Sequence, residues 1–173
     1  MRQKSVLAIV ALWAAIPFAS ANAQLESRKV LPLALAQKAA NAAITSCEHS
    51  GYAVSAVVVE ASGRIRFEAV GDHATVHTPT SAYRKAYTVV TMGPIFHLDT
   101  SSAFAAAVAK NPSGPALSSL PDVAPLPGGV AIKVGDEIVA ALGVGGAPGG
   151  EKDEVCAQAG VASIQDDITK SKP

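Results

Sequence analysis

The spacing of apolar and polar positions in the first half of the chain predicts a helix followed by a β-hairpin. Residues 31–50 are rich in alanine and leucine and are followed by Gly51, a residue typical of the position after a helix. Residues 52–70 begin with a β-branched run and, after a Ser-Gly turn, alternate charged and apolar side chains. This alternation predicts two antiparallel strands with one solvated face.

The middle of the chain has the pattern of two further helices. Thr78 is expected to be the N-cap of a helix over residues 79–91, which a Gly-Pro pair then terminates. An alanine-rich helix follows an Asp-Thr cap and extends to about residue 110. Residues 111–127 contain five prolines and are predicted to be mostly irregular.

The last third predicts a second hairpin and a closing helix. The hairpin covers residues 129–144, a glycine-rich loop follows, and the helix covers residues 151–168. The adjacent acids Asp153-Glu154 at its start are interpreted as part of a solvated face. The order helix, hairpin, helix, helix, hairpin, helix predicts an α+β fold with a single antiparallel sheet flanked by helices, formed by one domain over residues 24–173.

The first 23 residues have the pattern of a secretory signal peptide. Arg2 and Lys4 precede an apolar segment over residues 6–18, and Ala21-Asn22-Ala23 supplies a small-x-small cleavage site. An uncleaved membrane anchor is the alternative, but a bilayer needs about 20 apolar residues and this segment contains Pro17. We therefore expect a mature chain that is periplasmic or secreted and not held in the membrane.

Export changes the interpretation of the two cysteines, Cys47 and Cys156. An oxidising compartment favours a disulfide between them, and the alternative is two buried free thiols. A zinc finger or a thioredoxin-type site is excluded, because there are two cysteines and no C-x-x-C motif.

Composition and motifs exclude several classes of function. The chain has 14 basic and 14 acidic residues, so no overall field would attract nucleic acid or an anionic membrane. With 49% hydrophobic and 16% charged residues, a globular core is expected and disorder is not. The glycine-rich loop at residues 143–150 lacks the lysine of a phosphate-binding loop, and no hydrolase motif is present.

Two histidines, His73 and His77, bracket the loop that leads into the second predicted helix. The positive pole of a helix disfavours an imidazolium, and a neutral imidazole can ligate a metal. A haem site needs such an imidazole, an apolar or aromatic wall and cations for the propionates. The same segment offers the wall and the cations: Tyr83, Tyr87, Arg84 and Lys85. The alternative is a surface loop carrying two solvated histidines.

Several short motifs, in their order and spacing, resemble the GlcG/HbpS-like haem-binding family, which is also seen as the C-terminal domain of PduO-type proteins. The resemblance covers residues 30–168 and includes Gly51-Tyr52, Val57-Val58-Val59-Glu60, Asp72-x-Ala74, Lys85-Ala86-Tyr87-Thr88, Pro127-Gly128-Gly129-Val130 and Gly143-Val144-Gly145-Gly146. It implies about five antiparallel strands with helices on the faces of the sheet. It also implies assembly into homo-oligomers and, in some members, binding of haem or a related tetrapyrrole.

The first hypothesis is therefore an exported haem-binding or haem-handling protein. Its ligand site is expected beside the start of the second helix, built from Asp72, His73 and His77, with Arg84 and Lys85 as anion partners. His77 is the first choice of axial ligand and His73 the second, and the glycine-rich loop is expected to form the opposite wall. The alternatives are an enzyme or accessory protein for a small organic acid or other metabolite, and a non-catalytic structural oligomer.

Overall fold

The computed structural model of the chain describes residues 27–170, so the predicted signal peptide lies outside the described residues. In chain order the elements are α1 (Leu33–His49), β1 (Ser55–Glu60), β2 (Ile65–Val70), α2 (Thr78–Phe96), α3 (Ser101–Ala109), α4 (Gly114–Ser118), β3 (Gly129–Val134), β4 (Glu137–Gly145), α5 (Gly150–Ala162) and α6 (Gln165–Lys170).

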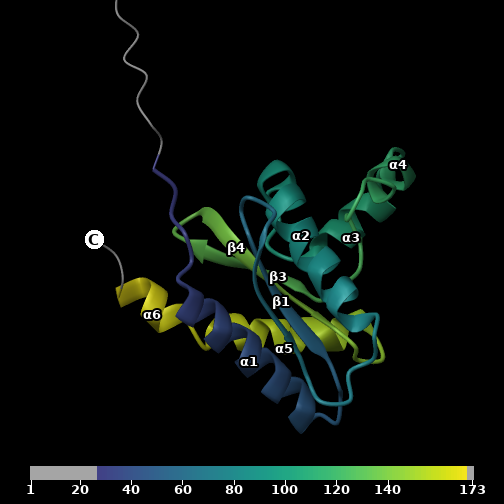
Figure 1. The fold of residues 1–173 in the computed structure, drawn as a ribbon. Coiled ribbons are helices and arrows are strands. Elements are labelled where there is room, and N and C mark those ends of the chain that lie inside the picture. The colour runs from purple at the N-terminus through teal and green to yellow at the C-terminus, as the bar shows by residue number, and fades with distance from the viewer. Residues whose placement is uncertain (1–26, 171–173) are drawn as a thin grey trace, which may run out of the picture.

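One antiparallel sheet, with the strand order β2-β1-β4-β3, lies between two layers of helices (Figure 1). Helices α1 and α5 lie side by side on one face, and α2 packs on the other. The central strands β1 and β4 pair from Ser55 opposite Gly145 to Glu60 opposite Ala140. This arrangement confirms the predicted α+β fold and its two hairpins.

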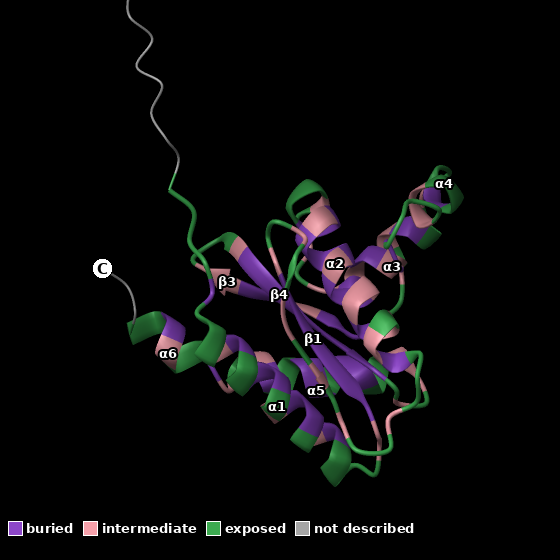
Figure 2. Ribbon diagram, viewed as in Figure 1, coloured by how far each residue is buried: buried purple, intermediate pink, exposed green. Residues whose placement is uncertain are grey.

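The core lies on both faces of the central strands, which Figure 2 shows as buried. Side chains of β1 alternate between the two faces: Ala56 and Val58 pack in the cluster that contains α1 and α5, while Val57 and Val59 pack with α2. The solvated positions of the first hairpin are therefore confined to the edge strand β2, whose Ile65 and Val70 are exposed. The sequence pattern predicts instead one solvated face that both strands of the hairpin share.

The sheet has four strands in the described part of the chain, where the family resemblance implied about five. Next to β3, a single antiparallel bridge joins Thr100 to Val130, and the Asp99 carbonyl accepts a hydrogen bond of 2.8 Å from the Ala131 amide. The pairing stops there because Thr100 is already the N-cap of α3, accepting from the Ala103 amide at 3.1 Å. This confirms the predicted cap.

Two predicted helix ends are wrong. Helix α2 continues through Gly93 and Pro94 to Phe96, with Met92 and Gly93 buried, so packing of the last turns outweighs the hydrogen bond that the proline cannot donate. The N-cap of α2 is His77 rather than Thr78. The Thr78 hydroxyl instead bonds the Thr75 carbonyl at 2.8 Å and lies 2.7 Å from the Ser55 hydroxyl.

The closing helix is divided into α5 and α6, where one helix over residues 151–168 was predicted. The break falls at Ser163 and Ile164, where the Ser163 hydroxyl donates to the Gly160 carbonyl at 2.7 Å and Ile164 is fully buried. The proline-rich stretch is mostly irregular, as predicted, and contains the short helix α4. No helix within residues 27–170 is both long and apolar enough to cross a membrane.

The predicted disulfide is present and joins α1 to α5. The Cα atoms of Cys47 and Cys156 are 5.5 Å apart, within the range that a disulfide spans, and both residues are buried. The bridge closes a separation of 109 residues, for which constraint of the unfolded chain contributes about 2–4 kcal/mol. The two helices that cover the face of the sheet opposite α2 are thus covalently linked.

Helix α2 lies directly against the backbone of β4. Gly143 makes this possible, because a Cβ at that position would collide with the Ala82 carbonyl oxygen. Gly145 has the same role one turn earlier, where a Cβ would stand 2.9 Å from the Thr78 carbonyl oxygen. These two glycines at the end of β4 therefore fix the position of α2 by close approach.

Candidate functional site

An open cavity of about 330 Å³ lies against the N-terminal half of α2. One wall is a face of the helix, and the other belongs to residues 123–127, which we call the strap. The lining residues are His77, Thr80, Ser81 and Arg84 from the helix side, and Ala124 and Leu126 from the strap. The helix positions are three, four and seven residues after His77, the spacing that places side chains on one face.

His77 is exposed at the N-cap of α2, and its Nδ1 atom lies 3.1 Å from the Thr75 hydroxyl oxygen. A histidine that ligates a metal through one ring nitrogen generally donates a hydrogen bond from the other. In the tautomer whose Nδ1–H donates to Thr75, the lone pair of Nε2 is available to a metal. His77 therefore has both the exposure and the orienting contact that an axial ligand needs.

Arg84 provides the positive charge of the cavity. Its Nη2 atom donates to the Val123 carbonyl at 3.1 Å, which links the helix to the strap. A guanidinium has five N–H donors, so this bond leaves others for a carboxylate. Ala124 and Leu126 give the strap an apolar surface, and Leu126 is 54% exposed although it is apolar. The cavity thus combines an imidazole, a cation and an apolar wall.

Lys85 is directed away from this cavity, although it follows Arg84 in the sequence. Its side chain is 4% exposed, and its Nζ atom lies 2.6 Å from Asp153 Oδ2 and 3.0 Å from the Val144 carbonyl oxygen. A step of one residue rotates a side chain by about 100° around a helix, here toward the core. The charge expected to hold a ligand's anion is therefore neutralised inside the protein.

Asp153 and Glu154 are buried, so the prediction that they form a solvated face is wrong. Burial raises the pKa of the Asp153 carboxyl, while its hydrogen bonds from Lys85 and from the Ala147 amide oppose that rise. Glu154 accepts hydrogen bonds from the Gly128 amide at 3.0 Å and the Ser102 hydroxyl at 2.5 Å. Adjacent acids at a helix start carry no local sign of such long-range partners.

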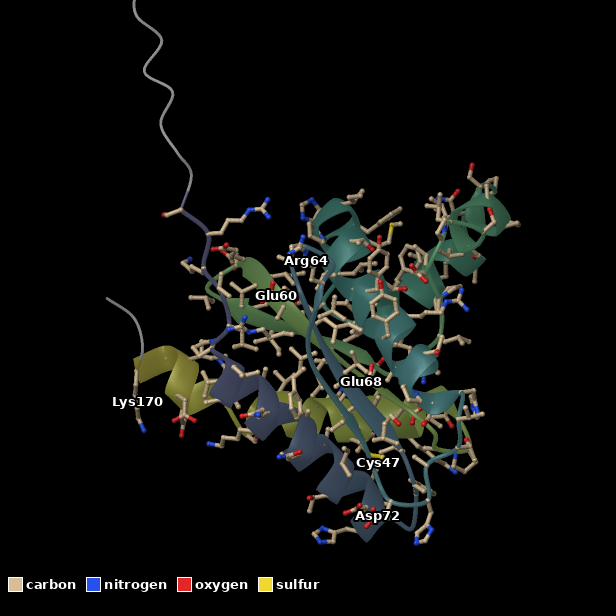
Figure 3. All side chains as sticks on the ribbon, viewed as in Figure 1. Cys47, Glu60, Arg64, Glu68, Asp72 and Lys170 are labelled. Atoms are coloured by element: carbon tan, nitrogen blue, oxygen red, sulfur yellow. A yellow bond between two sulfur atoms is a disulfide. The ribbon has the colours of Figure 1, made fainter. Side chains whose placement is uncertain are left out.

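Asp72 and His73 are exposed in the loop before α2, and neither lines the cavity. Figure 3 shows Asp72 at the lower edge of the view, below Cys47. His73 adopts a positive φ of 64° within this loop. Of the five expected ligand-binding residues, the structure thus brings His77 and Arg84 together at one cavity and leaves Asp72, His73 and Lys85 outside it.

The expected walls are also different. Tyr83 and Tyr87 pack against each other, with ring centroids 5.6 Å apart, and join the core cluster under α2 rather than the cavity. Burial raises the pKa of the Tyr83 phenol, with Asp122 contributing. The glycine-rich loop was expected to form the wall opposite α2, but it packs against α2 from the side of the sheet. The strap forms the opposite wall instead. Helical spacing from His77 would have found Thr80 and Ser81, whereas Ala124 and Leu126 have no local signal.

A second cavity, of about 510 Å³, lies at the C-terminal end of α2. His97, the C-cap of the helix, is in its lining, and the other polar lining residues are Asp99, Lys133, Asp136 and Glu137. Lys133 bonds both carboxylate oxygens of Asp99, at 3.0 and 3.1 Å, and Glu137 pairs with Lys29 at 2.7 Å. This cavity is larger than the first, and its lining has three carboxylates and one lysine.

Comparisons with known proteins agree with this fold. The sequence model of the family described as haem degrading protein HbpS-like matches residues 31–162. The crystal structure of a double mutant of Streptomyces reticuli HbpS is 35% identical, with a TM-score of 0.74, and the match covers 87% of this chain and 98% of that one. A comparison with curated proteins found no match.

Two more distant structures share the fold. Klebsiella pneumoniae protein ORFY is 21% identical with a TM-score of 0.67, and the match covers 87% of this chain and 99% of that one. A PduOC–heme complex is 20% identical with a TM-score of 0.68, covering 79% and 96%. The family match spans most of the chain, and the identity to HbpS extends over nearly all of that protein. The chain therefore belongs to the HbpS-like family of haem degrading proteins.

Proposed function

We propose that this protein binds haem in the cavity between α2 and the strap, with His77 as axial ligand and Arg84 as partner of a propionate. The observation that carries the proposal is the placement of an imidazole and a guanidinium on one face of α2, opposite the apolar strap. Seven residues of helix separate them by about 10 Å along the axis. A flat ligand with a metal centre and peripheral carboxylates matches this arrangement, and membership of a haem-handling family supports it.

The chain's own residues have distinct tasks in this proposal. Thr75 orients the imidazole of His77, so that Nε2 faces the ligand. Arg84 stays tied to the strap through the Val123 carbonyl and offers its remaining donors to a carboxylate. Ala124 and Leu126 cover the apolar ring and exclude water from it. Bound haem would supply a redox-active iron with an axial position for His77.

Haemin titration of the exported, processed protein tests the proposal. We expect a Soret band that saturates with haemin, and a His77→Ala variant whose affinity falls at least about tenfold, or whose spectrum changes, because the axial bond is lost. The matched control is His97→Ala, which removes the histidine at the other end of α2 and should leave binding unchanged. His73→Ala tests the second choice of axial ligand.

Two results would contradict the proposal. If His97→Ala abolishes binding while His77→Ala has no effect, the ligand site lies at the C-terminal end of α2. If the wild-type protein shows no affinity for haemin, haem is not the ligand. The guanidinium of Arg84 would then favour the alternative ligand, a small organic acid. Titration of the protein with small carboxylic acids would test that alternative.

We also propose that the protein is exported and acts in the periplasm or outside the cell. The signal-peptide pattern of residues 1–23 supports this, and so does the disulfide between Cys47 and Cys156, since disulfides persist in oxidising compartments. Intact-mass measurement of protein recovered from the extracytoplasmic fraction should give a chain that begins at Gln24. A mass that still includes residues 1–23 would contradict cleavage.

A further inference from the structure

The strap is attached to the rest of the protein at both of its ends. At its beginning, the Ala124 amide donates to the Thr88 hydroxyl at 2.8 Å, and Arg84 bonds the Val123 carbonyl. Just beyond its end, the Gly128 amide donates to Glu154 Oε2 at 3.0 Å. Pro125 and Pro127 have no amide hydrogen to donate. These bonds, together with the packing of buried Val123 in the cluster that contains Phe104, hold the apolar wall in place.

Glu154 is an unusual anchor, because it is a buried carboxylate whose hydrogen-bond partners in the described part of the chain are neutral donors. It is 9% exposed, and besides Gly128 it accepts from the Ser102 hydroxyl at 2.5 Å and the Ser102 amide at 3.3 Å. The nearby ammonium of Lys85 is bonded to Asp153 instead. A buried charge is retained when its hydrogen bonds hold it, and a charge-assisted bond to an amide is stronger than a neutral one.

The site around Gly128 leaves little freedom for the chain. A Cβ at Gly128 would stand 2.8 Å from Lys85 Cδ and 2.9 Å from Asp153 Cβ, so the ion pair fills the space beside it. The Gly128 carbonyl accepts from the Val144 amide at 2.9 Å, and the next amide, of Gly129, donates to the buried Ser101 hydroxyl at 2.8 Å. Three elements, α3, α5 and β4, thus meet where the strap ends.

We infer that Glu154 is a positioning residue of the haem cavity: through the Gly128 amide it sets the distance of the strap from the α2 face that carries His77 and Arg84. Leu126 is two residues before Gly128, so a shift of Gly128 is passed to the wall through Pro127 alone. Glu154 itself does not line the cavity. The inference rests on the proposed function, since the cavity it shapes is the proposed haem site.

Glu154→Gln tests the inference with a side chain of the same shape. The Gly128 amide then bonds a neutral amide oxygen instead of a charged carboxylate oxygen, which is the stronger acceptor, and an NH₂ group can replace the oxygen that accepts from the Ser102 hydroxyl. We expect haemin affinity to fall about tenfold, with the Soret maximum unchanged because His77 is intact. The matched control is Glu151→Gln, an exposed position three residues earlier in α5, which should leave affinity unchanged.

Two further variants separate positioning from a loss of stability. Ser102→Ala removes the hydroxyl that bonds Glu154 and leaves the bonds from the Ser102 and Gly128 amides, so it should lower the melting temperature without lowering haemin affinity. Leu126→Ala removes the wall itself, and adding Glu154→Gln to it should cause little additional loss of affinity, because neighbouring effects that act through one element are not additive. Affinity losses that simply follow the melting temperature across these variants would overturn the inference.

Hydrogen exchange of the haem-free protein gives a readout that does not depend on haem. Glu154→Gln should accelerate exchange of the Gly128 and Leu126 amides, whereas Glu151→Gln should not. If exchange accelerates but haemin affinity is unchanged, Glu154 anchors the strap without positioning the site, and the inference fails. If wild-type protein binds no haemin, the proposed function fails and the inference with it, while the exchange result still shows whether Glu154 holds the strap.

Discussion

The two ends of α2 each present a histidine beside a cavity, yet they differ in the charges around it. At the N-terminal end, the cavity of about 330 Å³ contains Arg84 and no carboxylate in its lining. At the C-terminal end, the cavity of about 510 Å³ contains three carboxylates and a lysine that is already bonded to one of them. Glu137 is also paired, with Lys29, so Asp136 is the carboxylate of this lining that has no ion pair among the described residues. The proposed assignment of an anionic ligand to the first cavity therefore rests on charge and not on volume.

The two ends also differ in how deeply their ion pairs are buried. Lys85 and Asp153, beside the N-terminal half of α2, have side chains that are 4% and 3% exposed. Lys133 and Asp99, at the C-terminal end, are 32% and 58% exposed. Removing one partner of a buried pair leaves an uncompensated charge, whereas an exposed charge is compensated by water. The first pair should therefore matter for folding and the second should not.

The largest expected effect follows from this difference. Lys85→Met should lower the free energy of unfolding by about 3–5 kcal/mol at pH 7, because the Asp153 carboxylate then remains buried without its partner. Lys133→Met, the matched change at the other end of α2, should lower it by less than about 1 kcal/mol. Urea unfolding of both variants measures the two losses. Equal losses would show that burial does not distinguish the two ion pairs.

A smaller effect is expected on ligand binding. Arg84→Gln keeps a hydrogen-bond donor but removes the charge, and it should weaken haemin binding about tenfold, since bonds to charged groups contribute about 1.5–3 kcal/mol. Lys133→Gln removes one positive charge at the C-terminal cavity and should change affinity by less than about twofold. Titrations at two salt concentrations show whether the difference is electrostatic. A greater loss in Lys133→Gln would reverse the assignment of the two cavities.

The smallest expected effect is a pH dependence at the buried pair. Burial raises the pKa of Asp153 above its ordinary value of 3.8, so the folded state favours the protonated carboxyl. This contribution to stability is fully present below the unfolded pKa and is lost as the pH rises through the folded pKa. Unfolding free energies of wild type, measured relative to Asp153→Asn, should therefore decrease as the pH is raised from about 4.

The same measurement in the Lys85→Met background sharpens this prediction. The hydrogen bond and charge of Lys85 lower the pKa of Asp153, so their loss should move the decrease to higher pH. The Asp153→Asn variant in that background is the reference, because it cannot titrate. A difference that is independent of pH in both backgrounds would mean that the carboxyl has the same pKa folded and unfolded.

The order of elements was predictable from the sequence, because it follows from local patterns. The partners of the buried charges were not predictable. Alternation and glycine turns indicated both hairpins, and the compartment suggested the Cys47–Cys156 bridge. The burial of Glu154 depends on Gly128 and Ser102, which are 26 and 52 residues away in the sequence. Lys85 likewise meets Asp153 across 68 residues. No periodicity within one helix carries such information.

The candidate site was predicted in part for the same reason. His77 and Arg84 share a helix face, so their proximity follows from helical spacing alone. The wall opposite them comes from a proline-rich stretch whose path depends on Thr88 and Glu154, and sequence favoured the glycine-rich loop for that place. Local spacing therefore defined one side of the cavity, and tertiary contacts defined the other.

The glycine at position 143 limits which substitutions the fold can accept. Because the Ala82 carbonyl occupies the space where a Cβ would stand, even alanine at this position would lift α2 from the sheet. The helix is one continuous element from Thr78 to Phe96, so lifting it would displace both histidines at once. Substitutions in the lining of either cavity can therefore alter its chemistry, but the two cavities cannot shift apart while the helix remains unbroken.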